Sequence, residues 1–447
     1  MKVINNQRNP VLPLSEYLPD AEARVMPDGQ LYIYADFDGR DDVFCSETMH
    51  FASTPDMQHW RVYANMLNGH DVPWFDDPSY PHYPGIDWRK PTPFIQQMLA
   101  GQDSASMKEK FEAQANLPKP PLLFAPDAIE KNGRYYLFFN MPDDTEGVAV
   151  ANTPTGPFVI MVQLPIGGID PSIFIDADGQ AYLYWGQLHS HGVKLNDDLL
   201  GLDRDGIVDD LVTESQHFFH EGSSMRKIGD TYYYVYADMQ RGKPTALGYA
   251  TGKSPLGPFT YRGIIVDNAK CDPQSWNNHG SIACFHGQWY VFYHRSSRNS
   301  QLHRRLCIEP ITIQADGTIP EVPMTSQGVG QPFAPGEAIM GYQACEVAGG
   351  AFIDQDRKFG ETLTNLISGS SATFRYVKSD KAWQDISLIA TGSGEIAVDL
   401  NDDACGSVII KDGYVTAHHL QAPAGQYTLT LQVVSGDNLQ IKQVTLY

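Results

Sequence analysis

"GGIDPSIFIDADGQAYLYWG", residues 167–186, holds the pattern that decides the fold. One carboxylate, Asp170, precedes a short apolar run, and an Asp-Gly turn and a run of aromatic residues follow. An Asp-Gly pair between two β-prone runs is a strong signal for a β-hairpin. The stretch therefore predicts two antiparallel strands, with a charged residue where the first strand begins.

Four other stretches repeat this plan. They are "PDAEARVMPDGQLYIYAD" from Pro19, "APDAIEKNGRYYLFFN" from Ala125, "HEGSSMRKIGDTYYYVYAD" from His220 and "NHGSIACFHGQWYVFYHR" from Asn278. The five leading residues are Asp20, Asp127, Asp170, Glu221 and His279. Three of their intervals span 43 to 58 residues, and the first spans 107 because it holds an insertion at about residues 64–120. Similar turn sequences at 52–60, 151–158 and 250–259 predict a matching outer turn in three of the units.

Repeats of this length fit four-stranded blades, so we predict an all-β chain with a five-bladed β-propeller. If each leading residue begins the innermost strand of its blade, all five side chains meet at one end of the axis. A single Asp at such a place could simply cap a turn. Five coincident positions favour a shared functional pocket instead.

The composition limits the partners. The chain has 447 residues, a formal net charge of −21 and a pI near 4.9, whereas nucleic acids and anionic membranes require basic patches. No apolar run approaches the ~18 residues of a membrane span, and the N-terminus lacks the apolar core of a secretory signal. We expect a cytoplasmic protein, with a leader removed beforehand as the alternative. The six scattered cysteines predict reduced thiols rather than disulfides.

The character of the sequence changes near residue 335. Short alternating segments such as "GSGEIAVDL" and "GQYTLTLQVV" are separated by Gly, Ser and Asp turns, which is typical of an antiparallel β-sandwich. We therefore predict two domains, a propeller over residues 1–334 and a smaller β-sandwich over residues 335–447. Within the insertion, residues 104–117 are expected to form a short helix.

Five motifs in order resemble glycoside hydrolase family 43. They are "DAEARV" at Asp20, "APDA" at Asp127, "IDPSIF" at Asp170, "EGSSMRK" at Glu221 and "NNHGSI" from Asn277, and "RRLCIEPI" from Arg304 extends the last one. The resemblance covers roughly residues 10–330 and implies a five-bladed propeller that cleaves arabinosides or xylosides. Residues 337–447 resemble carbohydrate-binding module family 6, and packing on the propeller is expected there rather than sugar binding. Only Trp383, Tyr414 and Asn438 are candidate sugar contacts in that module.

The resemblance also implies roles for single residues in an inverting mechanism. Asp20 is expected to be the general base, Glu221 the general acid and Asp170 the anion that keeps Glu221 protonated. Arg304 and Phe124 are candidate sugar contacts, and Asp127 is another, with a structural role as its alternative. His279 is expected beside one structural Ca²⁺ or Na⁺ ion in the channel, held mainly through water, with no organic cofactor.

The expected reaction is the release of terminal α-L-arabinofuranosyl or β-D-xylosyl residues from plant-cell-wall oligosaccharides. A non-catalytic sugar-binding propeller, a fructosidase and a glycosidic phosphorylase are the alternatives. The sequence does not choose between arabinose and xylose, and the oligomeric state is open. The aromatic residues of the insertion are expected either to line the mouth of the pocket or to pack on the rim of the propeller. They are Trp74, Phe75, Tyr80, Tyr83 and Trp88. Arg295 and Arg305 are predicted to be surface charges as readily as functional groups.

Overall fold

The computed structural model describes residues 2–75, 77–83, 85, 120–243, 246–271, 277–357, 360–411 and 416–447. The helix predicted at 104–117, and the candidate contacts Trp88 and Tyr414, lie outside these residues. Within the described part, no helix is long and apolar enough to cross a membrane. The six cysteines are free thiols, and four of them are buried.

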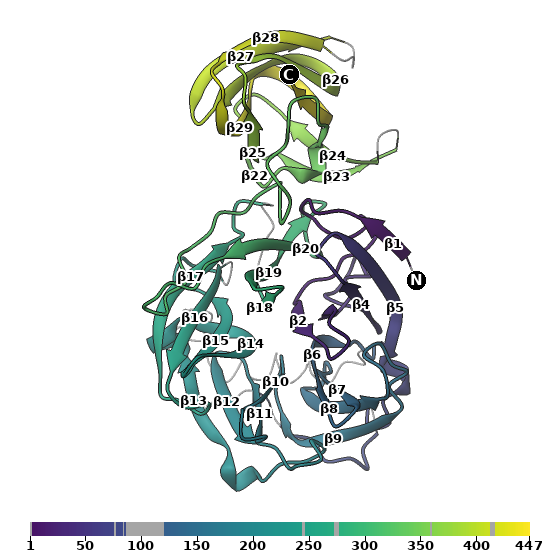
Figure 1. Ribbon diagram of the computed structural model, residues 1–447. Helices are drawn as coiled ribbons and strands as arrows, with labels where there is room; N and C mark the ends of the chain where they lie inside the picture. Colours follow the sequence, from purple (N-terminus) through teal and green to yellow (C-terminus); the bar gives the residue numbers. More distant parts are fainter. Residues whose placement is uncertain are drawn as a thin grey trace, which may run out of the picture.

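The described part of residues 1–311 forms five antiparallel sheets arranged in a ring (Figure 1). Blade 1 contains β2 (Glu22–Val25), β3 (Leu31–Ala35), β4 (Thr48–Thr54), β5 (His59–Asn68) and, outermost, β1 (Lys2–Asn5). Blade 2 contains β6 (Phe124–Lys131), β7 (Arg134–Asn140), β8 (Thr145–Ala151) and β9 (Ile160–Gly167). Blade 3 contains β10 (Ser172–Ile175), β11 (Ala181–Trp185), β12 (His189–Lys194) and β13 (Val208–Thr213).

Blade 4 contains β14 (Phe219–Ile228), β15 (Thr231–Asp238), β16 (Ala246–Gly252) and β17 (Phe259–Asp267), and blade 5 contains β18 (Ser281–Phe285), β19 (Gln288–Ser297) and β20 (Ser300–Ile311). Short helices are η1 (Gly69–Asp71), η2 (Arg204–Gly206), α3 (Glu214–His217) and, in the C-terminal part, η3 (Gly341–Gln343). The predicted five-bladed propeller is confirmed.

The predicted hairpins are the two innermost strands of each blade. In blade 3, Ile173 of β10 lies opposite Leu183 of β11, and Gly179 in the connecting turn has φ of +86°, a conformation that glycine adopts without steric cost. The turns predicted at 52–60, 151–158 and 250–259 connect the third strand of a blade to the fourth. The inner strands β2, β6, β10, β14 and β18 therefore surround the axis (Figure 1).

Apolar cores fill the spaces between neighbouring blades. Between blades 3 and 4, for example, the rings of Tyr184 and Tyr234 pack edge to face with centroids 5.5 Å apart. The ring closes between blades 5 and 1. There the hydroxyl of Ser281 donates to the carbonyl of Ala21 (2.8 Å) and accepts from the amide of Ala23 (3.0 Å). These contacts fix the inner strands relative to one another, and the inner strands carry the site.

The C-terminal residues form a separate, nine-stranded antiparallel system of the β-sandwich type (Figure 1). Its strands are β21 (Ile339–Met340), β22 (Glu346–Ala348), β23 (Phe352–Asp356), β24 (Gly360–Leu366), β25 (Ser371–Ser379), β26 (Trp383–Leu400), β27 (Asp403–Ile410), β28 (Thr416–Ala422) and β29 (Gly425–Leu446). Trp383 is only 1% exposed and belongs to the core of this system, so it offers no platform for a sugar. The domain boundary at residue 334 stays a prediction.

Two arginines of blade 5 hold the C-terminal part. Arg305 forms an ion pair with Glu361, and Arg295 donates to the carbonyl oxygen of Ala344 at 3.0 Å. The prediction that Arg295 and Arg305 are surface charges is wrong, because each residue is 4% exposed. A buried guanidinium needs a counter-charge or several acceptors, and the C-terminal part supplies them.

Candidate active site

Two of the leading carboxylates share an unusual backbone conformation. Asp20 and Asp170 have φ of +52° and +58°, and each lies two residues before its inner strand. The left-handed region is rare outside glycine, and Asp is among the residues that tolerate it best. The same turn therefore introduces β2 and β10 and leaves a carboxylate at the same end of both strands.

The imidazole of His279 lies between these two carboxylates. Its Nδ1 is 3.7 Å from Asp170 Oδ2 and 3.9 Å from Asp20 Oδ1. The ring also lies close to Gly222, where an added Cβ would come within 2.7 Å of a ring carbon. Only glycine at this position, next to Glu221, allows β14 to approach His279. Three leading residues and the backbone of a fourth therefore meet at one end of the axis.

Glu221 is connected to Asp20 through two side chains. Asn277 Nδ2 donates to Glu221 Oε1 at 3.2 Å, and the carbonyl oxygen of Asn277 lies 2.9 Å from His294 Nε2. The other nitrogen of that imidazole, Nδ1, accepts from the backbone amide of Asp20 at 3.4 Å and also lies 3.4 Å from Asp20 Oδ1. Burial lowers the pKa of His294 to about 3, so this ring is neutral. This neutral chain links Asp20 to Glu221 indirectly, and no hydrogen bond or ion pair among the described residues joins the two carboxyl groups directly.

Arg304 forms the strongest contact with Asp20. Its Nη1 lies 3.0 Å and 2.8 Å from the two carboxylate oxygens. Burial by itself would raise the pKa of Asp20, but the guanidinium group holds it below its ordinary value. Arg304 also donates from Nε and Nη2 to Asp38, at 2.9 Å and 2.8 Å. The predicted sugar contact Arg304 is thus bound to two carboxylates of the protein itself.

Asp170 and Glu221 differ in their surroundings. Burial and the neighbouring Glu221 raise the pKa of Asp170 well above its ordinary value. Glu221 accepts a hydrogen bond from Gln187 Nε2 at 2.8 Å in addition to the one from Asn277. Two buried acids that raise each other's cost of ionisation favour a single negative charge, so the pair retains one proton. The sequence-based expectation instead treats Asp170 as a plain anion.

Asp127 faces a different part of the channel. Its two oxygens accept from Arg24 Nε (2.9 Å) and Nη2 (2.5 Å), from the hydroxyl of Ser172 (3.0 Å) and from the amide of Ile173 (2.8 Å). These donors leave no acceptor for a sugar hydroxyl, so the geometry favours the structural alternative. Phe124 begins β6 and is partly exposed.

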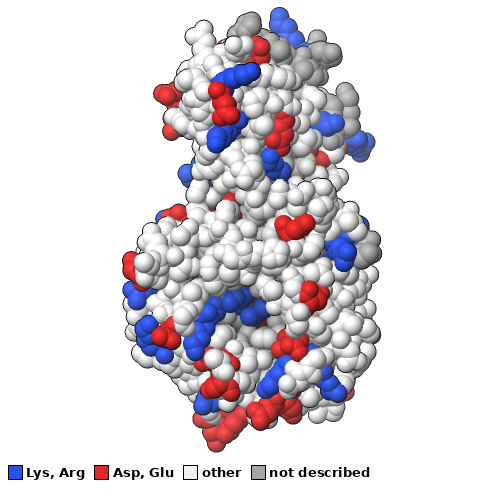
Figure 2. Space-filling view, viewed as in Figure 1, with Lys and Arg blue, Asp and Glu red and all other residues white. Residues whose placement is uncertain are grey.

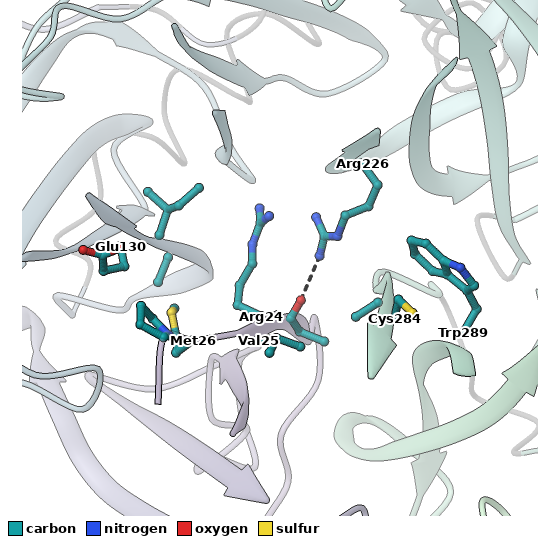
Figure 3. A pocket seen from close by; sticks show the side chains of 12 residues that line it. Arg24, Val25, Met26, Glu130, Arg226, Cys284 and Trp289 are labelled. Atoms are coloured by element: carbon teal, nitrogen blue, oxygen red, sulfur yellow. Dashed lines mark hydrogen bonds between the residues drawn. The ribbon is translucent and has the colours of Figure 1, made fainter. Parts of the chain in front are cut away.

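Two further arginines occupy the channel below the carboxylates. Arg24 from β2 and Arg226 from β14 point into its middle, and Arg226 donates to the carbonyl oxygen of Ala23 at 2.9 Å (Figure 3). Arg226 also forms an ion pair with Glu22, and Arg24 with Asp127. The two arginines line a cavity of about 460 Å³ at the end of the channel opposite Asp20. In the space-filling view, basic side chains line part of the hollow in the middle of the propeller (Figure 2). The pair Arg24–Asp127 joins the inner strands of blades 1 and 2, and the pair Arg226–Glu22 joins those of blades 4 and 1 across the channel.

Sequence reasoning missed several residues that complete the cluster around Asp20. Asp36 and Asp38 directly follow β3, Cys45 lies in the loop after them, and His294 ends the aromatic run of blade 5. For Asp36 and Asp38 the sequence does offer a signal. Residues two apart at the end of a strand point to the same side, so these two carboxyl groups could be expected together. The contact with Arg304 was not predictable, because Asp38 and Arg304 are 266 residues apart in the chain.

Comparisons with known proteins agree with this geometry. The model of glycosyl hydrolases family 43 matches residues 99–319. A β-xylosidase from Xylanibacter ruminicola is 32% identical over 240 residues, which cover 44% of this chain and 73% of that protein. The chain belongs to glycosyl hydrolase family 43. It is therefore a glycoside hydrolase.

Relatives of this family also match over the full length. A xylosidase/arabinosidase from Thermoclostridium stercorarium is 27% identical over 515 aligned positions, which cover 98% of each chain. An arabinoxylan arabinofuranohydrolase from Bacillus subtilis, solved with cellotetraose, has a TM-score of 0.52 and 20% identity, with 99% of this chain and 97% of that chain covered. At this identity the second comparison supports the fold alone.

The sequence also predicts a cation beside His279. Among solved family 43 enzymes, one from a compost metagenome is a calcium-free form in complex with xylotriose. In the described part of this chain, three ligand atoms come close together only at Asp20, Asp36 and Cys45. The guanidinium group of Arg304 already contacts that group. The group of Asp20, Asp36 and Cys45 is therefore occupied by a cation of the protein itself, and an ion held through water beside His279 stays a prediction.

Proposed function

We propose that this family 43 enzyme releases terminal α-L-arabinofuranosyl or β-D-xylosyl residues from plant-cell-wall oligosaccharides with inversion at the anomeric carbon. The observation that carries the proposal is the buried cluster in which Asp20 and Glu221 lie apart, joined through His294 and Asn277. Support for the substrate comes from relatives named xylosidase/arabinosidase and from a family member of Xanthomonas citri solved with xylotriose.

The proposed reaction divides two proton transfers between the carboxylates. Asp20, which Arg304 keeps ionised, accepts a proton from a water molecule as the water oxygen bonds to the anomeric carbon. At the same time the glycosidic C–O bond breaks, and Glu221 delivers its proton to the leaving oxygen. Asp170 shares the buried site with Glu221, and this pair holds the one proton that the leaving group requires.

Asp170, His279 and Asp127 have supporting roles in this proposal. The position of His279 between Asp20 and Asp170 separates the base from the pair that carries the proton. Asp127 braces the channel through Arg24 and does not touch the sugar. Phe124, at the start of β6, is the candidate for an apolar contact with the sugar ring.

Turnover of nitrophenyl arabinoside and xyloside by Asp20→Asn and Glu221→Gln tests these roles. Both variants should lose turnover of oligosaccharides. A nitrophenol leaving group needs no protonation, so such substrates should partly restore turnover in Glu221→Gln but not in Asp20→Asn. Asp28→Asn, in the exposed turn between β2 and β3, is the matched control. Turnover near the wild-type value in either variant would remove that residue from its role, and no turnover by the wild type on both sugars would support a non-catalytic sugar-binding propeller.

A further inference from the structure

Three buried carboxyl groups share one guanidinium group beside the reaction centre. Asp36 is 0% exposed, Asp38 is 1% exposed and Asp20 is 6% exposed. The charged and titratable groups that face Asp20 and Asp36 are Arg304 from β20, His294 from β19, His279 before β18, Asp38 and Cys45 after β3, and Asp170 before β10. Burial lowers the pKa of both imidazoles, so neither carries a charge at neutral pH. Arg304 is the one cation in this set of groups.

The hydrogen bonds show which carboxyl groups can be ionised. Asp38 accepts from three nitrogens of Arg304 (2.8–2.9 Å) and from the amide of Cys45 (3.2 Å). Asp20 accepts from Arg304 Nη1 with both oxygens. Such charge-assisted contacts stabilise a carboxylate in a buried site. Burial raises the pKa of Asp38, and the contacts with Arg304 oppose that rise. One guanidinium group therefore supports two carboxylates, Asp20 and Asp38.

Asp36 has no comparable partner. Its Oδ2 accepts from the thiol of Cys45 at 2.6 Å and lies 3.9 Å from Arg304 Nη2. Its Oδ1 accepts no hydrogen bond from any residue that the structure describes. A third negative charge here would be buried against Asp20 and Asp38 with no cation left to pair with it, which is strongly unfavourable. The carboxyl group of Asp36 must therefore be protonated.

A protonated Asp36 has a natural acceptor in Asp20. One carboxyl oxygen of each residue and the sulfur of Cys45 lie within 4.8 Å of one another, so the two carboxyl groups are neighbours in one buried cluster. Burial and the charge of Asp20 raise the pKa of Asp36 well above its ordinary value. This direction agrees with the lack of charged hydrogen-bond donors to Asp36 among the described residues. A hydrogen bond to a carboxylate favours its ionised form.

We propose that Asp36 is a positioning residue that keeps its proton, donates it in a hydrogen bond to Asp20, and thereby sets the low-pH limit of hydrolysis. The proposal rests on the function assigned to Asp20 above. Because the hydrogen bond favours ionised Asp20, its loss should make the base protonate at a higher pH. Activity would then fall on the acidic side of the profile and persist on the neutral side.

The acidic limb of kcat/KM against pH reports the ionisation of the free enzyme's base and tests the proposal. Asp36→Ala removes the donor, so the limb should move to higher pH by about one unit, a tenfold loss of kcat/KM at a fixed pH below it. Asp36→Asn places an amide N–H where the acid O–H was and can still accept from Cys45. The acidic limb of Asp36→Asn should therefore stay at the wild-type pH. A purely structural defect would shift or spare the limbs of Asp36→Ala and Asp36→Asn alike.

Cys45→Ala is the matched control, since it removes a contact of Asp36 without removing the Asp36 proton. Its acidic limb should stay in place. Thermal unfolding midpoints of the three variants separate loss of folding from a shifted profile. The proposal is overturned if the limb of Asp36→Ala does not move, or if Asp36→Asn shifts it equally.

A second measurement does not need a substrate. The infrared difference spectrum between wild type and Asp36→Asn at neutral pH should show the C=O band of a protonated carboxyl group that the variant lacks. Carboxylate bands in its place would overturn the proposal. If the wild type hydrolyses no arabinoside or xyloside, the proposed function fails, while this spectrum still tests the proton on Asp36.

Discussion

Glu146 on β8 gives a stability prediction that is independent of the reaction. The residue is 0% exposed, and within the described part of the chain neither of its carboxylate oxygens has a hydrogen-bond partner. Burial, with a smaller contribution from Asp144, raises its pKa well above the ordinary value. The folded protein therefore holds a proton on Glu146 that the unfolded chain releases at neutral pH.

The sign of the pH effect follows from this difference. Below the ordinary pKa of Glu146 both states hold the proton, and the residue has no pH-dependent effect on stability. Above it the unfolded chain gains from ionisation, so wild-type stability falls by about 1.4 kcal/mol per pH unit until the folded pKa is reached. Glu146→Gln cannot ionise and keeps the volume of the side chain. The variant should be more stable than wild type at pH 7 by roughly 2–3 kcal/mol, and the advantage should disappear near pH 4.

Urea unfolding of wild type and Glu146→Gln between pH 4 and 8 measures this difference. Glu47→Gln is the matched control, because the Glu47 side chain is 36% exposed and pairs with Arg40. The control should track the wild type at every pH. A Glu146→Gln advantage that is constant with pH, or absent at pH 7, would refute the argument and would mean that Glu146 has an ionic partner in solution.

Two further predictions concern the ends of the channel and the C-terminal part. Glu361→Gln leaves Arg305 buried without its counter-charge and should lower the free energy of unfolding by roughly 3–5 kcal/mol. The double variant that also carries Arg305→Met should recover part of that loss. An unchanged urea midpoint in Glu361→Gln would contradict the buried ion pair. Dialysis against a chelator should leave both turnover and the thermal midpoint unchanged, because Arg304 already pairs with the acidic group formed by Asp20, Asp36 and Cys45. A fall in either that added Ca²⁺ reverses would show the predicted ion beside His279.

The convergence of the leading residues was predictable from local patterns. Asp-Gly and similar turns define the hairpins, and their regular spacing defines the blades. In a propeller the inner strands all begin at the same end of the axis, so Asp20, Asp170, Glu221 and His279 were expected together. Period and turn chemistry are local properties of the chain, which is why sequence alone was sufficient here.

The partners of those residues depend on closure of the ring and were not predictable. Arg304 reaches Asp20 only because blade 5 packs beside blade 1. Asp127 follows the same local sequence pattern as Asp170, but its carboxylate forms an ion pair with Arg24 in the channel. Arg305 looked like a surface charge because the residue that buries it, Glu361, lies in the C-terminal part. Long-range charge pairing leaves no periodic trace in the sequence.

The anomeric configuration of the first sugar released tests the central claim most directly. With Asp20 as base and Glu221 as acid on opposite sides of the bond, water attacks once and the configuration inverts. ¹H NMR in the first minutes of hydrolysis should therefore show the anomer opposite to that of the substrate. If the initial product instead retains the substrate's configuration, a carboxylate attacks the sugar directly, and the assignment of Asp20 as a base for water is wrong.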